Sequence, residues 1–257
     1  MAWGLQDGTR VYFVLPRSPF GSFAERSVTA RRTCLPLPDE LDDATAAGTA
    51  NPAMSSWVAL KVRARLAAGE TVLILGVTGG AGQLAIQIAK RLGARRVIAV
   101  GREPQEARLK ELGADALVSL NQDRAELVSA LREWAHLGVD VVLDYLWGQP
   151  AEILLEAIAK RGLQHAASRI RYVHIGSVAG DPISLPGATL RSSKLELLGS
   201  GFGSASVQEM LQSIAGFFQE SAREPFQAAI VTAPLEDVEA VWKPGGTGRS
   251  RGVSAFN

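Results

Sequence analysis

The feature that most constrains the fold is a strict alternation of strand-like and helix-like segments from about residue 70 onward. The first strand, residues 71–75, is apolar without polar alternation, as expected for a parallel strand that is covered on both faces. The helix after it has Leu84, Ile88 and Leu92 at helical spacing and ends at Gly93. This alternation predicts right-handed βαβ crossovers and an α/β fold with a doubly wound parallel Rossmann sheet.

The rest of the chain divides into a short β-type region and a long α/β region. Further strands are predicted at 97–100, 116–119, 138–144, 171–175 and 195–198, with helices at 83–92, 104–112, 123–134, 150–159 and 207–218. Upstream lie short β-type runs at 10–15 and 22–30, followed by an Ala-rich stretch, 42–66, that is mostly helical in pattern.

Composition indicates an ordinary soluble protein and excludes several classes. The chain has 257 residues, of which 47% are hydrophobic and 21% charged, so a sizeable core is available. Its net charge of +1 argues against a nucleic-acid or membrane-surface partner, either of which needs a basic excess. The single cysteine, Cys34, excludes an internal disulfide and fits a reducing compartment. With no signal-peptide pattern and no apolar run of spanning length, we expect a cytoplasmic protein.

A glycine-rich turn separates the first strand from its helix. Positions without side chains let the backbone approach a pyrophosphate, and the amino terminus of the helix holds the anion. Thr78 stands where G-x-G-x-x-G has its second glycine, and a turn that only the chain geometry requires is the alternative. The cofactor-binding residues predicted here are Gly76, Thr78, Gly79, Gly80, Ala81 and Gly82.

The end of the second strand indicates which dinucleotide is bound. An NAD site places an acidic residue there for the ribose hydroxyls, whereas this strand ends in Gly101 and Arg102. A guanidinium can pair with a 2′-phosphate, so the sequence predicts NADP(H), although Glu103 is adjacent. The alternative is that Arg102 is a solvated surface residue.

Two later loops follow the fourth and fifth strands. Tyr145 and Leu146 follow the fourth strand, and Gly176 and Ser177 follow the fifth. Carboxyl ends of parallel strands face the ligand crevice, so we expect these loops to contact the nicotinamide half of the cofactor. Ordinary loop chemistry is the alternative for each residue.

Several kinds of catalytic site are not supported by the sequence. His136, His165 and His174 lack metal-ligand spacing, so no metal is expected. There is no Tyr followed four residues later by Lys, no G-x-S-x-G elbow and no P-loop. No catalytic residue is identified.

These segments together resemble the medium-chain dehydrogenase/reductase superfamily, in its zinc-independent, zeta-crystallin-like quinone oxidoreductase branch. The resemblance is carried by residues 68–76, 79–90, 92–94, 109–115 and 139–144. Upstream, 7–11 and 21–25 resemble the end of the family's GroES-like substrate domain. The resemblance implies a two-domain NADPH-dependent reductase, usually a homodimer, that acts on quinones or α,β-unsaturated carbonyls.

The resemblance also implies a domain division. We expect a partial, N-terminally truncated GroES-like β domain at 1–45, a Rossmann domain at 46–205 and a C-terminal helix with the return to the substrate domain at 206–257. The gap between Val11 and Gly21 has no cysteine, which argues against structural zinc. Residues 243–252 are polar and unfavourable for a strand, where the family has an apolar strand.

The function expected from the resemblance is NADPH-dependent reduction of a small quinone or enone by direct hydride transfer without zinc. The alternatives are a catalytically impaired NADP(H)-binding protein and a relative of zinc alcohol dehydrogenases. Ser55 aligns with a family hydroxyl that approaches the nicotinamide carboxamide. Residues 193–200 align with a sheet edge where two subunits pair, so we expect a homodimer.

Overall fold

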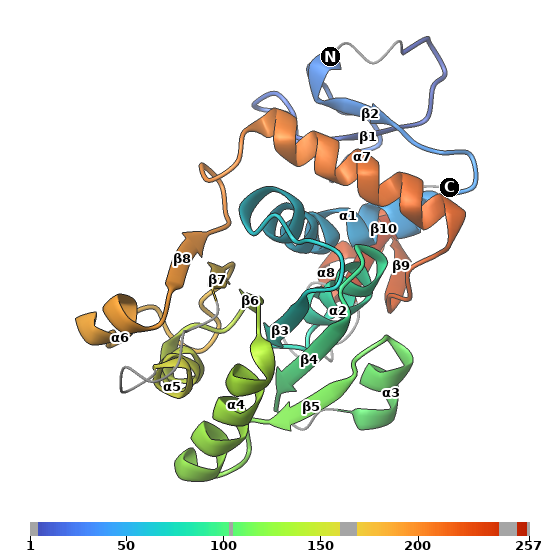
Figure 1. Ribbon diagram of the computed structural model, residues 1–257. Coiled ribbons are helices and arrows are strands. Elements are labelled where there is room, and N and C mark those ends of the chain that lie inside the picture. The colour runs from blue at the N-terminus through green and yellow to red at the C-terminus, as the bar shows by residue number, and fades with distance from the viewer. Residues whose placement is uncertain (1–4, 103–104, 160–168, 242–250, 256–257) are drawn as a thin grey trace. The chain divides into compact units, whose positions relative to one another are not determined.

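The computed structural model describes residues 5–102, 105–159, 169–241 and 251–255 (Figure 1). The chain forms two compact units, one made of Met1–Met54 with Val207–Asn257 and the other of Ser55–Ser206. The predicted domain limits at residues 45 and 205 stay a prediction.

The second unit contains a six-stranded parallel sheet in the order β5-β4-β3-β6-β7-β8 (Figure 1). The predicted Rossmann-like α/β fold is therefore present, and β3 and β6 lie side by side at its centre. The strands are β3 (Thr71–Leu75), β4 (Arg96–Gly101), β5 (Ala116–Ser119), β6 (Val141–Asp144), β7 (Ile170–His174) and β8 (Leu195–Gly199).

Helices connect these strands, as the alternation predicts. They are α2 (Gly80–Arg91), α3 (Glu106–Glu111), α4 (Arg124–Gly138), α5 (Gly148–Ile158) and α6 (Gly187–Ser192). The Asp123 carboxylate caps α4 by accepting the amides of Ala125 and Glu126 at 2.9 and 3.0 Å. Helix α2 begins three residues before the predicted start at 83, because the glycines at 80 and 82 enter its first turn.

The core of the unit lies around β3, whose five residues are all buried. Leu73 and Leu75 of β3 belong to one apolar cluster with Leu131 of α4 and Leu154 of α5. Burial of one such side chain contributes about 1.5–3 kcal/mol. The uninterrupted apolar character of residues 71–75 is therefore explained by cover on both faces.

The Ala-rich stretch folds as two helical pieces that run into each other. Helix α1 (Asp43–Trp57) continues into a π-helical segment, Val58–Arg63. The wider turn ends with the amide of Ala64 donating to the carbonyl of Ala59 at 2.8 Å. Short π-helical segments occur often at functional sites, and this one directly follows the last turn of α1.

The first unit contains two small sheets. Strand β1 (Val11–Phe13) pairs with β2 (Cys34–Pro36) antiparallel, which is consistent with part of a GroES-like domain. Tyr12 packs edge-on against Phe218, with ring centroids 5.4 Å apart. The other elements are 3-10 helices at Arg31–Thr33 and Leu235–Asp237, α7 (Val207–Arg223), β9 (Ile230–Pro234), α8 (Val238–Val241) and β10 (Arg251–Ala255).

One prediction about this unit is wrong. Residues 22–30 form no strand, and the Thr29 hydroxyl in this segment instead donates to the carbonyl of Val14, 15 residues away, at 3.1 Å. Of the polar segment 243–252, predicted to be unfavourable for a strand, residues 243–250 lie outside the described residues, and only its last two residues are seen, at the start of β10. Parallel pairing with β9 satisfies the β10 backbone and overrides that local preference.

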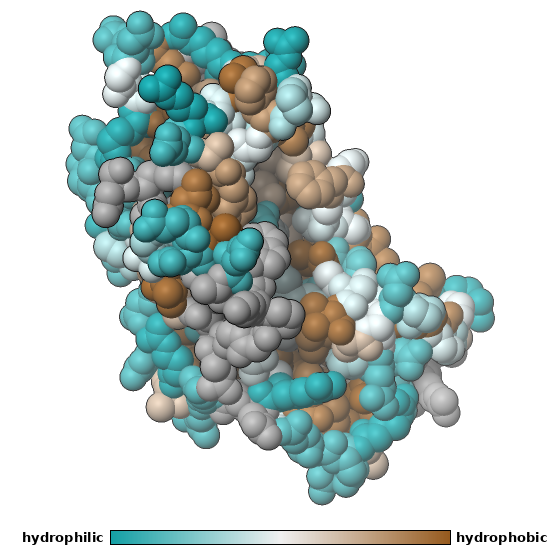
Figure 2. Space-filling model, turned by 180° about the vertical axis from the view of Figure 1, so that it is seen from behind, coloured by the Kyte–Doolittle hydropathy of each residue, from teal (hydrophilic) through white to brown (hydrophobic). Residues whose placement is uncertain are grey.

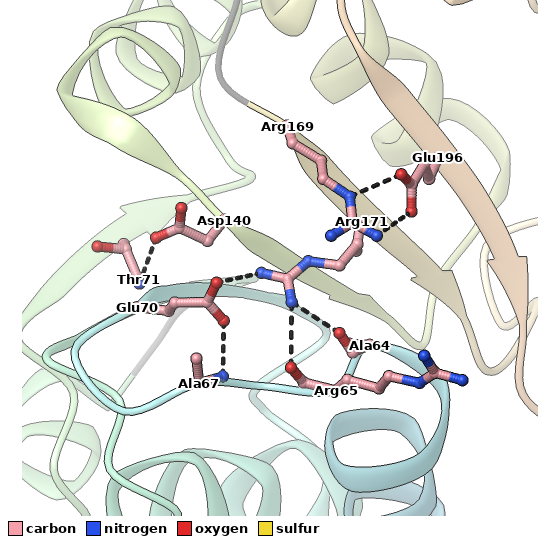
Figure 3. A network of polar contacts seen from close by, with 9 residues as sticks. All are labelled: Ala64, Arg65, Ala67, Glu70, Thr71, Asp140, Arg169, Arg171 and Glu196. Carbon is pink, nitrogen blue, oxygen red and sulfur yellow. Dashed lines mark hydrogen bonds and ion pairs between the residues drawn. The ribbon is translucent and has the colours of Figure 1, made fainter.

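The amino ends of the central strands are joined by a polar network (Figure 3). The buried Arg171 guanidinium, on β7, donates to the carbonyls of Ala64 and Arg65 at 2.7 and 3.2 Å and pairs with Glu70 at 2.6 Å. Glu70 also accepts the amide of Ala67 at 2.8 Å. The network fixes the end of the π-helical segment beside the start of β3.

The surface of the molecule is mixed in character. Figure 2 shows one face, on which hydrophilic side chains surround separate small apolar patches. Within the described residues, no helix combines the length and apolarity that a membrane crossing requires.

Candidate functional site

The predicted site residues gather at the carboxyl edge of the parallel sheet. Strands β3 and β6 are neighbours there, and the chain proceeds from β3 to β4 on one side but from β6 to β7 on the other. Ligands of open α/β sheets bind at such a switch point, outside the carboxyl ends of the strands.

The glycine turn after β3 has two kinds of glycine. Gly76 has a φ of +100°, and a Cβ on Gly82 would collide with the carbonyl oxygen of Gly76 and lie 2.7 Å from Val77 Cα. A Cβ on Gly79 or Gly80 meets nothing within 4 Å. Chain geometry therefore requires Gly76 and Gly82, whereas Gly79 and Gly80 leave open space in front of the turn.

The turn delivers the chain into the amino terminus of α2. Gly79 is the extended residue before this helix of 12 residues, so the amides of Gly80, Ala81 and Gly82 have no acceptor within the helix. These amides and the positive end of the helix dipole suit an anion. Thr78 is exposed beside them.

The end of β4 lies against the same turn. Gly101 is buried, and a Cβ there would lie 3.0 Å from Val77 Cγ2 and 3.3 Å from Thr78 Cγ2. Arg102 follows at an exposed position and makes no hydrogen bond or ion pair with another described residue. Arg102 thus directly follows a residue that packs against the glycine turn, and Glu103 lies outside the described residues.

The buried carboxylate of Asp144 fixes the loop after β6. Its Oδ1 accepts the amides of Leu146 and Trp147 at 2.8 and 2.9 Å, and its Oδ2 accepts the Tyr172 hydroxyl at 2.7 Å. Burial raises the pKa of Asp144, although these hydrogen bonds oppose the shift. Because both oxygens are engaged, Asp144 acts on the loop and not as a free base.

Tyr145 lies between this loop and the last turn of α1. It is 9% exposed, and its hydroxyl lies 2.9 Å from the Oγ of Ser56, which is completely buried. Burial raises the pKa of the Tyr145 phenol, while hydrogen bonds from Ser56 and Ser55 lower it. Ser55, the residue predicted to meet the carboxamide, is half-buried.

The loop after β7 completes the edge. A Cβ on Gly176 would lie 3.1 Å from the carbonyl oxygen of Tyr145. The Ser177 hydroxyl is 3.1 Å from Nε2 of His174, whose ring lies against Trp147 with centroids 4.5 Å apart. Gly176 and Ser177 are half-buried.

The structure thus connects the predicted residues through direct neighbours. Gly101 lies against Thr78, Gly76 against Tyr145 and Leu146, and Tyr145 against Gly176 and the serine pair. Sequence reasoning missed the roles of Asp144 and Ser56. A carboxylate directly after three apolar strand residues is a signal for Asp144, but Ser56 has none, because its partner Tyr145 is 89 residues away.

The described residues do not fit a metal ion. Across the described ranges, no three His, Cys, Asp or Glu side chains are grouped as a metal site requires. His165 lies outside those ranges.

Comparison with known proteins assigns much of this unit to a family. The family model described as zinc-binding dehydrogenase matches residues 80–216. The chain is 32% identical over 228 residues to the probable NADPH-dependent quinone reductase tdiC of Emericella nidulans, covering 84% of this chain and 62% of that protein. The chain thus spans less than two thirds of the length of this curated relative.

Solved structures show the same similarity. The quinone oxidoreductase of Thermus thermophilus, studied also in complex with NADPH, is 27% identical, with a TM-score of 0.69 over 92% of this chain and 73% of its own. A probable oxidoreductase of Mycobacterium abscessus is 27% identical, with a TM-score of 0.73 over 98% of this chain and 74% of its own.

Proposed function

Because the chain belongs to the zinc-binding dehydrogenase family of the medium-chain dehydrogenase/reductase superfamily, we propose that it is an NADPH-dependent oxidoreductase that reduces quinones or α,β-unsaturated carbonyls. The fungal relative and the Thermus enzyme, both associated by name with quinones and NADPH, support this proposal. Bound NADPH supplies a hydride, so the protein has to bind and orient the two reactants.

The observation that carries the proposal is the open space in front of Gly79 and Gly80. Packing among the described residues gives no reason for glycine at either position, since a Cβ there meets nothing of them within 4 Å. The approach of a pyrophosphate to the backbone does give a reason, because it requires glycine beside the free amides of a helix start.

The chain's own residues divide the binding between them. The amides of Gly80, Ala81 and Gly82 hold the pyrophosphate, and the Arg102 guanidinium pairs with the 2′-phosphate. Ser55 binds the nicotinamide carboxamide, and the loops at Tyr145–Leu146 and Gly176–Ser177 border the nicotinamide. Substrate lies against this end, where the chain orients the acceptor carbon or oxygen toward the nicotinamide.

The family name implies zinc, but the described residues do not fit it. Metal ligation needs several His, Cys, Asp or Glu side chains together, and the described parts of the chain offer no group of three. We therefore assign no step to a metal.

The test is steady-state oxidation of NADPH with benzoquinone and, separately, with a simple enone as acceptor. We expect oxidation of NADPH to require the acceptor, and its rate to be unchanged by a chelator. A protein that binds NADPH but oxidises it with neither acceptor would instead be a binding protein without turnover. Chelator-sensitive turnover would support the alcohol-dehydrogenase alternative.

A further inference from the structure

Resting on the proposed cofactor site, we infer that Tyr145 is a positioning residue: its phenol holds Ser55 and Ser56 so that the Ser55 hydroxyl meets the carboxamide of the nicotinamide. The proposal assigns a role to a buried hydroxyl that the proposed binding of the cofactor does not otherwise use. It concerns only residues of the second unit.

The backbone of Tyr145 is fixed on both sides. Its amide donates to the carbonyl of Leu75 at 3.2 Å, at the end of β3. The Asp144 carboxylate holds the next two amides of the loop, and the Tyr145 carbonyl lies against Gly176. Tyr145 Cβ is in turn close to the Gly76 backbone, where an added Cβ would lie 3.2 Å from it. The side chain therefore starts from a rigid point at the switch between β3 and β6.

From that point the ring reaches the last turn of α1. Its hydroxyl lies 2.9 Å from Ser56 Oγ and is also hydrogen-bonded to the Ser55 side chain. Two serines from one helix turn are thus tied to a residue at a strand end. A phenylalanine would fill the same space but could not hold either serine, so apolar packing alone gives no reason for the hydroxyl.

Exposure distinguishes the three hydroxyl groups. Ser56 is completely buried and Tyr145 nearly so, whereas Ser55 is half-buried. Ser55 is therefore the member of the group that a ligand can reach, with Tyr145 and Ser56 behind it. A serine hydroxyl both donates and accepts, which matches a carboxamide with its own N–H and C=O groups.

The experiment compares two ligands that differ in the nicotinamide half. Isothermal titration gives the Kd of NADPH and of adenosine 2′,5′-bisphosphate, which lacks the nicotinamide, for the wild type, Tyr145→Phe and Ser55→Ala. We expect each variant to bind NADPH about 2- to 10-fold more weakly, the range for one neutral hydrogen bond. The Kd of the bisphosphate should stay unchanged.

A double variant tests whether Tyr145 acts through Ser55. In Ser55→Ala/Tyr145→Phe the loss of NADPH affinity should equal the larger of the two single-variant losses and not their sum, because both substitutions remove the same contact. Ser56→Ala, which removes the other partner of the phenol, should show the same selectivity for the nicotinamide half. Ser56→Ala also replaces Tyr145→Phe in the test if that variant does not fold.

Tyr12→Phe is the control. It removes a phenol on β1 of the first unit, which has no part in the proposed cofactor site. We expect its Kd values for both ligands to match the wild type.

The outcomes separate this inference from the proposed function. Equal losses for both ligands in Tyr145→Phe, an unchanged Kd for NADPH, or additive losses in the double variant would overturn the positioning role alone. A wild type that does not bind NADPH would overturn the proposed function, and with it this inference.

Discussion

Gly82 and Gly80 lie two residues apart in one turn, yet only Gly82 is required by packing. Gly82→Ala places a Cβ against the Gly76 carbonyl, so we expect a loss of about 1–3 kcal/mol in unfolding free energy, as for overpacked cores. Gly80→Ala meets open space within a helix and should leave stability equal or up to about 1 kcal/mol higher. Urea denaturation of both variants measures the difference.

The same pair separates folding from binding. If the space before Gly80 admits the pyrophosphate, Gly80→Ala should fold well and still bind NADPH more weakly. A Gly80→Ala protein that loses stability as Gly82→Ala does would show that the turn is glycine-rich for chain geometry alone.

Arg102 is the residue on which cofactor choice depends. A hydrogen bond to a charged group contributes about 1.5–3 kcal/mol, and exposure of Arg102 places the expectation at the lower end. Arg102→Ala should therefore weaken NADPH binding about tenfold, at about 1.4 kcal/mol per decade, and leave NADH nearly unchanged. Titration of both cofactors into both proteins measures this.

A control arginine guards against a general charge effect. Arg132 is also exposed but lies on α4, and Arg132→Ala should leave both affinities unchanged. Equal losses for NADPH and NADH in Arg102→Ala would mean that Arg102 does not meet the 2′-phosphate. Tighter binding of NADH than NADPH by the wild type would overturn the NADP(H) assignment.

At the residue scale, features that depend on neighbours in the sequence were predicted, whereas contacts between residues far apart in the sequence were not. The glycines of the turn are close in sequence, and their spacing follows from backbone geometry, so the sequence indicates them directly. The hydrogen bond between Tyr145 and Ser56 joins residues 89 positions apart, and no local pattern encodes such a contact.

At the scale of elements, Arg171 of β7 and Arg169, just before this strand, offer a matched comparison (Figure 3). The Arg171 side chain is 7% exposed and joins Glu70 and the end of the π-helical segment, whereas Arg169 pairs with Glu196 at side-chain exposures of 63% and 43%. Arg171→Met should lower the free energy of unfolding by about 3 kcal/mol. This is the lower end of the range for a broken buried ion pair, because the Glu70 side chain is 23% exposed. Arg169→Met should leave the free energy of unfolding close to the wild-type value, because both members of its ion pair are exposed.

Chemical denaturation at neutral pH compares the two variants with the wild type. Methionine keeps the unbranched apolar stem in each case, so the difference reports the polar contacts. Equal losses would mean that the network at the amino edge of the sheet is no stronger than a surface ion pair.

The elements of the Rossmann-like sheet were predictable because the strands at its centre, β3, β4 and β6, are buried and mostly apolar. The first unit was harder, because its short strands depend on partners far along the chain. Strand β10 illustrates this: its first residues disfavour a strand, and only pairing with β9 makes one. Residues 22–30 show the reverse, since a β-type pattern without a ladder partner folds as a loop.

At the scale of the whole molecule, the sequence indicated an α/β chain with a small β part, and both parts are present. Their division was harder to predict, because helix α1 runs through the boundary between the units at residues 54 and 55. A continuous helix has no composition change that would mark such a boundary.

The edge of the sheet predicts how two chains associate. Within the described residues, β8 pairs with no strand other than β7, so its other side is a sheet edge, at which the Gly199 carbonyl accepts Arg63 Nε at 2.8 Å. Leu197 on this strand is 37% exposed, and Phe202 just beyond it is 87% exposed. An exposed edge strand with apolar side chains invites pairing with a second copy across a two-fold axis, so we expect a homodimer at micromolar concentration.

Light scattering of the wild type and of Leu197→Lys tests the dimer. A lysine on an edge strand opposes edge-to-edge pairing, so the variant should have the mass of a monomer while keeping its fold by circular dichroism. Val231→Lys is the control, because Val231 is also an exposed strand residue, at 50%, but lies on β9, which pairs with β10 in a separate sheet. A monomeric wild type would reject the dimer, and a dimer in Leu197→Lys that dissociates in Val231→Lys would move the interface away from β8.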